Sequence, residues 1–293
     1  MNSITIALNA KTNLSIQLEK KFDIQYYKKP SFLKKIFSFN QSYPDIYFHR
    51  GFLSREAVSL IEKAKVVILN SNSVKNEIIQ KLSHIEADKL SVVSPYFYSK
   101  IEYDGSIKKV FRKKYEIEKK SKIILFRAKD LDKSGLETVF ETVSRMYKEN
   151  FTLVIESSSK QINPLKLRME RSEIKFKYIL LEEYPNIDEL FIASDIFILP
   201  TKQKYFAYDV LRAMYYRNAV FLTQSNYASE LIDTFSLIHG NDDTSISFKI
   251  DSLLINKDEL KKIQKENQEI AQMQSLENKV AKMTEIIEKT FDI

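Results

Sequence analysis

Short runs of apolar residues alternate with longer amphipathic stretches along most of the chain. The apolar runs predict β-strands at 3–8, 45–50, 66–71, 90–95, 122–128, 151–157, 176–182, 195–200 and 219–223. The stretches between them predict helices at 54–64, 74–82, 108–120, 134–149, 163–173, 186–194, 208–217 and 228–233. This alternation is typical of parallel α/β architecture.

The strands form two series, separated at 96–106 by a connection without a regular period. We therefore expect an N-terminal domain at 1–100 and a second domain at 101–270. The polar tail 257–291 carries apolar residues at helical spacing, and we expect residues 271–293 to form a helix that packs back on the first domain or supports a dimer. Ligands of parallel sheets bind beyond the carboxyl ends of the strands, so we expect the site in a cleft between the two halves.

Composition excludes several classes of protein. The chain has 293 residues, 44% of them apolar, which is enough to build a core and excludes a disordered chain. It has no cysteine, and its three histidines are far apart, so no metal site is expected. Four glycines cannot form G-x-G-x-x-G or a P-loop. With no apolar run of about 20 residues and no signal peptide, we expect a cytoplasmic protein.

The net charge of +7 is concentrated at the N-terminus, where residues 1–39 hold seven lysines and two acids. Within this part, KKPSFLKKIFSF (28–39) alternates lysines with apolar residues. One interpretation is an amphipathic helix whose phenylalanines face the core. Another is peripheral contact with an anionic membrane, on the inner face of the cell membrane. Nucleic acid is the least favoured partner for this segment.

Four segments resemble, in order, the retaining GT-B glycosyltransferases of the family 4 group. They are AKVVILNSNSVKNEIIQKLSHIEADKLSVVSP (64–95), KIILFRAKDLDKSGLETVFETV (122–143), FTLVIES (151–157) and ELFIASDIFILPT…VLRAMYYRNAVFLTQSNYASELID (189–233). The resemblance implies a GT-B fold, with two Rossmann-like domains facing a cleft and a short first domain. It implies a nucleotide-sugar donor bound mainly by the second domain, an acceptor bound by the first, and no metal or other cofactor.

The resemblance also implies three catalytic residues. Arg127 and Lys133 match the family's Arg and Lys that neutralise the diphosphate of the donor. A leaving diphosphate gains negative charge, which fixed cations stabilise. His49 follows the pattern of an acceptor-side histidine, which would orient or deprotonate a hydroxyl group, although a histidine at this position can also simply cap the end of a strand.

The donor-site motif departs from the family. The paired glutamates of E-x7-E fall on Lys204 and Arg212, which cannot accept hydrogen bonds from ribose. Asp209 lies one helical turn before Arg212 and is either a substitute acceptor or an ion-pair partner of Arg212. The donor-binding candidates are therefore Arg127, Lys133, Lys204, Tyr205, Phe206, Asp209 and Arg212, with Tyr205-Phe206-Ala207 in place of the family's Gly-Phe-Gly.

Two functions follow from these observations. The first is a glycosyltransferase that moves a hexosyl or related sugar, with retention, from a nucleotide-sugar to a lipid-linked, lipopolysaccharide or other surface-glycan acceptor. The alternative is a catalytically inactive GT-B protein that acts as a partner or regulator. If all four cations (Arg127, Lys133, Lys204, Arg212) line one pocket, an anionic ligand is indicated, such as a donor with an acidic sugar. If Lys204 and Arg212 are each paired with acids, an inactive donor site is indicated.

Overall fold

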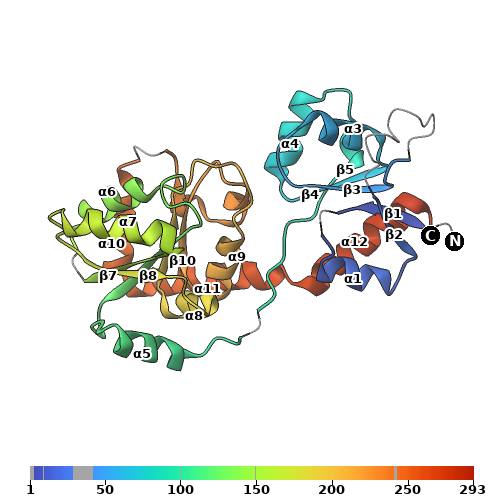
Figure 1. The fold of residues 1–293 in the computed structure, drawn as a ribbon. Helices are drawn as coiled ribbons and strands as arrows, with labels where there is room; N and C mark the ends of the chain where they lie inside the picture. Colours follow the sequence, from blue (N-terminus) through green and yellow to red (C-terminus); the bar gives the residue numbers. More distant parts are fainter. Residues whose placement is uncertain (1–2, 9, 29–41, 100, 149, 241–242) are drawn as a thin grey trace. The chain divides into compact units, whose positions relative to one another are not determined.

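The computed structural model describes the chain except for residues 1–2, 9, 29–41, 100, 149 and 241–242 (Figure 1). The described residues form two compact units. The first unit comprises Met1–Tyr96 and Gln274–Ile293, and the second comprises Phe97–Met273. Each unit has its own parallel sheet with helices between successive strands, which confirms the expected α/β class. The segment 28–39, expected to contact a membrane or pack in the core, lies outside the described residues apart from Lys28.

The first unit is built on a five-stranded parallel sheet with the strand order β2-β1-β3-β4-β5. Its strands are β1 (Ile4–Ala7), β2 (Ile24–Tyr26), β3 (Ile46–His49), β4 (Val66–Leu69) and β5 (Leu90–Val92). Its helices are α1 (Asn13–Glu19), α3 (Arg55–Lys63), α4 (Asn72–Lys81), the short 3-10 helix η1 (Ala87–Lys89) and α12 (Leu276–Phe291). The chain moves outward in opposite directions from β1 and β3, so the topological switch point lies between these two strands.

Helix starts in this unit are fixed by hydroxyl side chains. Thr12 and Ser15 form a reciprocal capping box at the start of α1, and Ser54 accepts a hydrogen bond from the backbone N–H of Ala57. The pattern predicted the next helix at 74–82. In the structure it begins two residues earlier, at Asn72, because the strand ends at Leu69 and the Ser71 hydroxyl caps the helix.

The second unit is built on a six-stranded parallel sheet with the order β11-β10-β9-β6-β7-β8. Its strands are β6 (Lys122–Arg127), β7 (Phe151–Ser157), β8 (Lys177–Glu182), β9 (Ile196–Leu199), β10 (Ala219–Thr223) and β11 (Leu237–Ile238). Its helices are α5 (Gly105–Lys114), α6 (Leu136–Ser144), α7 (Ser159–Glu170), α8 (Ile187–Ala193), α9 (Tyr208–Tyr215), α10 (Ser245–Ile255) and α11 (Lys257–Met273), with 3-10 helices η2 (Tyr227–Leu231) and η3 (Thr234–Ser236). This is the doubly wound Rossmann order, with its switch point between β6 and β9.

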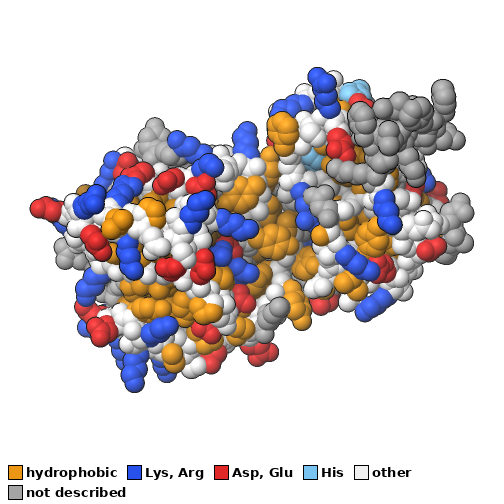
Figure 2. All heavy atoms as spheres, viewed as in Figure 1, with side chains coloured by type: hydrophobic (Ala, Val, Ile, Leu, Met, Phe, Trp, Pro, Cys, Tyr) orange, Lys and Arg blue, Asp and Glu red, His pale blue; other side chains and the backbone are white. Residues whose placement is uncertain are grey.

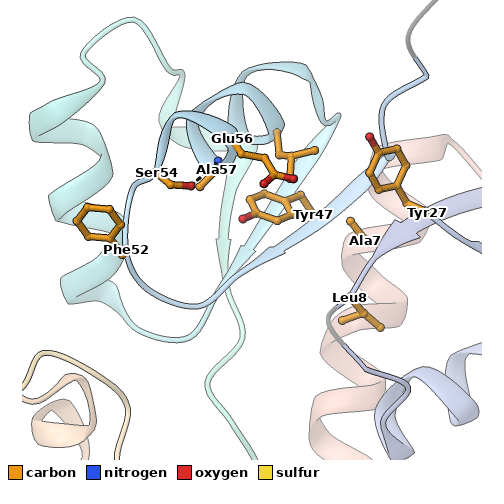
Figure 3. Close-up of a pocket in the computed structure, with 9 residues that line it drawn as sticks. Ala7, Leu8, Tyr27, Tyr47, Phe52, Ser54, Glu56 and Ala57 are labelled. Atoms are coloured by element: carbon orange, nitrogen blue, oxygen red, sulfur yellow. Dashed lines mark hydrogen bonds between the residues drawn. The ribbon is translucent and has the colours of Figure 1, made fainter. Parts of the chain in front are cut away.

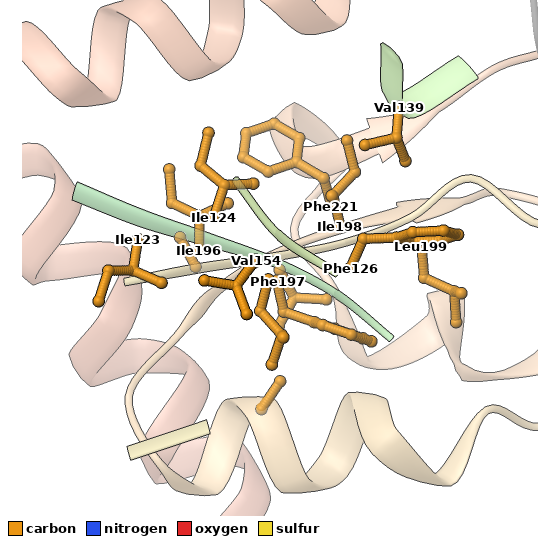
Figure 4. Packing of buried hydrophobic residues seen from close by; sticks show 14 of the residues in the cluster. Ile123, Ile124, Phe126, Val139, Val154, Ile196, Phe197, Ile198, Leu199 and Phe221 are labelled. Atoms are coloured by element: carbon orange, nitrogen blue, oxygen red, sulfur yellow. The ribbon is translucent and has the colours of Figure 1, made fainter. Parts of the chain in front are cut away.

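The core of the second unit is apolar on both faces of its sheet. Every residue of β7, β9 and β10 is buried, as are the four central residues of β6. Side chains such as Phe126, Phe197 and Phe221 pack between the strands and the covering helices (Figure 4). A parallel sheet covered on both faces needs continuous apolar strands, which is why these runs were recognisable in the sequence.

One buried carboxylate fastens α5 to the start of this sheet. Asp195 accepts a hydrogen bond from the backbone N–H of Ile123 (3.0 Å) and forms ion pairs with Lys108 (2.9 Å), Lys122 (3.1 Å) and Arg112 (3.4 Å). Burial alone would raise the pKa of Asp195, but the facing lysines and the backbone N–H outweigh it and hold this pKa below its usual value. Asp195 is the Asp of the SDIFILP segment, so this motif residue has a structural role.

The C-terminal tail, whose apolar residues have helical spacing over 257–291, contributes to both units. It forms two helices, α11 and α12, which belong to different units and are separated at Gln274 and Ser275. The Ser275 hydroxyl accepts a hydrogen bond from the backbone N–H of Asn278 and starts α12. Met283 and Ile287 of α12 are completely buried in the core of the first unit, where this helix packs against α1.

Lys279 of α12 is buried and makes no ion pair with any residue that the structure describes. Its ammonium group donates hydrogen bonds to Ser94 Oγ (2.8 Å) and to Gln274 Oε1. Burial, with a smaller contribution from the charge of Lys282, lowers the pKa of Lys279 to about 8. The α12 helix is therefore held by a cation that loses its proton more readily in the folded than in the unfolded chain.

We expect the free energy of unfolding to rise with pH between about 8 and 10.5, because in this range the unfolded state binds more protons than the folded state. The rise should be about 1–2 kcal/mol, less than full linkage gives because solvent screens part of the charge. Urea unfolding at several pH values measures it. A Lys279→Met variant should lose this rise, whereas Lys289→Met, the same change at an exposed position of α12, should keep it. An equal slope in all three proteins would contradict the expectation.

Candidate functional site

A pocket of about 420 Å³ lies in the second unit at the carboxyl ends of β6 and β9. One wall follows β6 and includes Arg127 and Lys129, and the other follows β9 and includes Gln203 and Tyr205. This position is the switch point of the doubly wound sheet, where the chain turns outward on both sides and leaves a crevice. Fold topology alone therefore marks this pocket as a candidate ligand site.

A chain of alternating charges runs below and beside the pocket. Arg127 Nε lies 2.7 Å from Glu156 Oε2, and Arg127 Nη1 is paired with Asp209. Asp209 also contacts Arg212 (Nη1–Oδ1 2.7 Å), whose Nε lies 2.9 Å from Asp188 Oδ1. Two guanidinium groups are thus held among three carboxylates.

The network holds Arg127 at the pocket wall while Glu156 lies buried behind it. Burial raises the pKa of Glu156, and the charge of Arg127 opposes this rise. Tyr205, on the opposite wall, has a pKa raised by burial and then by the charge of Asp209. The pocket therefore presents a fixed guanidinium and a protonated phenol at neutral pH.

Arg212 has no place on the pocket wall. Its guanidinium lies over the rings of Phe97 (5.5 Å to the centroid) and Phe191 (5.7 Å) and pairs with Asp188 and Asp209. Asp209 does line the pocket. The side chain of the motif that faces the pocket is therefore the Asp209 carboxylate, three residues before Arg212.

The other two expected cations also lie outside the pocket wall. The Lys133 side chain is 69% exposed and pairs with Asp130 (3.0 Å). Lys204 is exposed and forms no hydrogen bond or ion pair with any residue in the described part of the chain. Of the four cations considered in the sequence, only Arg127 lines the pocket, and only Arg212 of the charge-reversed pair is neutralised by acids, so neither criterion is met in full.

Lys129 is a pocket residue that the sequence did not single out as part of the site. It lines the pocket two residues after Arg127, is exposed, and makes no ion pair with any described residue. The available signal was its position directly after a buried strand, at the end where ligands bind in parallel sheets. Together, Arg127 and Lys129 give the pocket two positive groups on one wall.

Two loops of the pocket are fixed by close backbone contacts. Gly135 has φ +94°, and a Cβ atom there would lie 2.4 Å from the carbonyl oxygen of Pro200, so only glycine fits. On the other wall, Asn226 Oδ1 accepts hydrogen bonds from the backbone N–H groups of Ala207 (3.3 Å) and Ala228 (3.0 Å). The pocket is therefore largely preformed.

His49, the expected acceptor-side residue, is buried at the end of β3 and only 2% exposed. Its Nε2 lies 2.7 Å from the carbonyl oxygen of Gly51, which can only accept, so Nε2 carries the proton. Nδ1 then accepts from the Tyr47 hydroxyl (3.3 Å), and burial lowers the pKa of His49. Both ring nitrogens have partners, and His49 lines neither the pocket of the second unit nor the pocket of the first unit that is described next.

The first unit has its own pocket, of about 200 Å³, at the switch point between β1 and β3 (Figure 3). Leu8 follows β1, Tyr47 lies on β3, and Tyr27 faces the same space from the end of β2. The Glu56 carboxylate lies beside the Tyr47 ring, and burial and then this charge raise the pKa of Tyr47. The pocket thus combines aromatic rings with one carboxylate.

No metal site is formed by the described residues, in which no three His, Asp or Glu side chains converge. Metal-independent chemistry remains a prediction. None of the described helices is both long and apolar enough to cross a bilayer.

The model of the family described as glycosyl transferases, group 1, matches residues 107–270, more than half of the chain. The chain belongs to this family, and its fold is GT-B, as the resemblance implied. No curated protein sequence matches the chain.

Three solved structures illustrate the shared fold at low sequence identity. Alr3699/HepE of Anabaena, in complex with UDP-glucose, is 15% identical with a TM-score of 0.68, over 97% of this chain and 91% of that one. A glycosyltransferase of Rickettsia africae ESF-5 is 17% identical with a TM-score of 0.70, over 98% and 89%. WaaG, a glycosyltransferase involved in lipopolysaccharide biosynthesis, is 14% identical with a TM-score of 0.66, over 97% and 99%.

Proposed function

We propose that this chain transfers a sugar from a nucleotide-sugar donor, and that the pocket of the second unit binds the donor. The observation that carries the proposal is Arg127, which lines a preformed pocket at the switch point of a Rossmann-type sheet. The family match over 107–270 covers the whole of this pocket, and a structure with the same fold holds UDP-glucose. That the donor of this chain carries a nucleotide is itself part of the proposal.

The proposed chemistry needs no protein nucleophile. The bond between the anomeric carbon and the donor phosphate breaks, a bond from that carbon to the acceptor oxygen forms on the same face, and the acceptor proton passes to the leaving diphosphate. Transfer on the same face retains the configuration of the anomeric carbon. Arg127 and Lys129 stabilise the charge that develops on the diphosphate, because cations already in place need no reorganisation. Asp209 lines the same pocket and supplies acceptor oxygens for donor hydroxyl groups.

The acceptor in this proposal is a glycan or glycolipid that binds the first unit. The pocket between β1 and β3 supports this, because aromatic rings beside hydroxyl and carboxylate groups suit a sugar. Glu56 brings negative charge to this pocket, which favours a neutral sugar at the accepting end over a phosphate or an acidic sugar. A surface glycan such as lipopolysaccharide fits this class, and WaaG, which has the same fold, is involved in lipopolysaccharide biosynthesis.

A second candidate is an inactive GT-B protein that serves as a partner or regulator. The pairing of Arg212 with Asp188 and Asp209 favours it, because the position that carries a ribose-binding glutamate in the resembled family is committed to a structural network. Lys204 does not add support, since no described acid neutralises it.

A thermal-shift screen distinguishes the two candidates. The purified chain is melted with UDP, GDP, their sugar conjugates, CMP-sugars and free pyrophosphate. A ligand that binds only the folded state raises the melting temperature. At a concentration of 100 times its Kd, the ligand adds about 2.7 kcal/mol to the free energy of unfolding. We expect a shift with one nucleotide class, followed by release of that nucleoside diphosphate when an acceptor glycan is added. A cooperative melt that none of these ligands shifts would favour the inactive partner instead.

A further inference from the structure

Three large apolar side chains of the second unit lie exposed close to one another. Tyr147, after α6, is 73% exposed, and Phe248 and Ile255 of α10 are 55% and 64% exposed. The rings of Tyr147 and Phe248 are 5.8 Å apart between centroids. Phe248 and Ile255 are seven residues apart on one helix, which places them on the same face. Single exposed apolar residues are common, whereas a contiguous group indicates a contact surface.

Lysines surround the same place. A hollow of about 250 Å³ beside Ile255 is lined by Lys120, Lys148 and Lys257, and also by Lys122. Lys122 is paired with Asp195, but the other three are exposed and form no hydrogen bond or ion pair through their ammonium groups with any described residue. On the face of the second unit seen in Figure 2, by contrast, basic and acidic side chains are interspersed.

The arrangement is held by a buried carboxylate. Asp251 of α10 accepts hydrogen bonds from the backbone N–H groups of Tyr147 (2.8 Å) and Lys148 (3.1 Å). Asp251 itself is buried, and its carboxylate contacts these backbone amides and forms no ion pair with any described lysine. Among nearby acids, Asp258 pairs with Lys261 (3.5 Å), and Glu149 lies outside the described residues. The loop after α6 is thereby fixed against α10, with one aromatic and one basic side chain directed outward.

We infer that this group (Tyr147, Phe248 and Ile255 with Lys120, Lys148 and Lys257) is a docking surface for an anionic lipid membrane. We call it the apolar–lysine surface. A bilayer interface offers both of the environments that the group requires, since apolar and aromatic side chains enter the acyl boundary while lysines stay at the anionic headgroups. A nucleic acid or another soluble polyanion would use the lysines but would leave an aliphatic side chain such as Ile255 in water. The surface shares no residue with segment 28–39 or with either pocket.

Co-sedimentation of the full chain with vesicles tests the inference. We expect binding to vesicles of equal parts phosphatidylglycerol and phosphatidylcholine, weak binding to phosphatidylcholine alone, and a decrease with added salt. A Lys120→Ala/Lys148→Ala/Lys257→Ala variant should bind on the order of 100-fold more weakly, because each lysine near an anionic surface contributes about fivefold. A Phe248→Ser/Ile255→Ser variant should bind at least ~10-fold more weakly while keeping every lysine.

A matched control removes the same charge elsewhere in the unit. Lys160, Lys166 and Lys175 are likewise exposed and unpaired with any described residue, and changing all three to alanine should weaken binding about threefold or less. Absence of binding to the anionic vesicles would overturn the inference, as would equal losses in the two triple variants or binding that survives the triple change in the surface. Full binding by the Phe248→Ser/Ile255→Ser variant, with displacement by inorganic polyphosphate, would assign the lysines to a soluble polyanion and overturn the lipid assignment.

Discussion

Replacing Arg127 with alanine should abolish the melting shift that the donor nucleotide produces and slow sugar transfer by about 10²–10³-fold. Arg127 is the guanidinium that lines the pocket at the end of β6, and removing one preorganised group that stabilises transition-state charge has effects of this size. The melting temperature with and without nucleotide and the rate of nucleoside diphosphate release are the two measurements.

The same change also disturbs the protein itself, because it removes the positive charge that faces the buried Glu156 and leaves this carboxylate only the hydrogen bond from the backbone N–H of Tyr184. An Arg127→Ala/Glu156→Gln variant separates the two effects. It should recover most of the stability of the unliganded protein and still fail to bind the nucleotide. Arg171→Ala, at an exposed position after α7, should retain both binding and turnover. Undiminished nucleotide binding by the double variant would remove Arg127 from the donor site.

The largest expected loss of stability is at Asp195. An Asp195→Ala variant should lose about 3–5 kcal/mol of unfolding free energy, because Lys108, Lys122 and Arg112 would then face one another without the buried carboxylate that compensates them. Urea unfolding measures the loss. Asp195→Asn keeps an acceptor for the Ile123 N–H and should lose less.

The pH dependence gives an independent check on Asp195. Its pKa is lowered in the folded state, so the stability it contributes is present above the unfolded pKa of roughly 3.9 and is lost as the pH falls through the lower folded value. The Ala variant should lack this acid-side loss. Asp258→Ala, an exposed acid of α11 paired only with Lys261, should change the free energy of unfolding by less than about 0.5 kcal/mol. A comparable loss of unfolding free energy in both alanine variants would argue against a stabilising role for the ion pairs of Asp195.

Much of the fold was predictable because strands that are buried on both faces appear in the sequence as runs of apolar residues. Strands β6, β7, β9 and β10 are buried on both faces and appear as continuous apolar segments within one or two residues of their observed ends. The shorter strands β2 and β11 have three and two residues, too few to show a period. The exact position of the break between α11 and α12 was not visible in the pattern, since the apolar spacing continues on both sides of Ser275 although the two helices pack in different units.

The candidate site was predictable only where a side chain follows a strand directly. Arg127 ends β6, and its direction is set by the strand, so its place at the pocket could be expected. Lys133 is six residues further along a loop, and the loop turns it toward Asp130 and solvent, while Lys129 takes the place on the wall. At the charge-reversed motif, the residue on the pocket is Asp209, because the Arg212 side chain, one turn further along α9, lies against Phe97 and pairs with Asp188.

The first unit is assembled from two segments that are far apart in the sequence, which bears on the order in which the units can fold. Ile6 and Leu18 share a core with Met283 and Ile287, so the five-stranded sheet lacks part of its apolar cover until α12 has been synthesised. The second unit is one continuous segment and can fold while translation proceeds. The second unit can therefore complete its fold before the first, although most of the first unit is synthesised earlier. During this interval the five-stranded sheet needs protection against aggregation of its uncovered apolar surface.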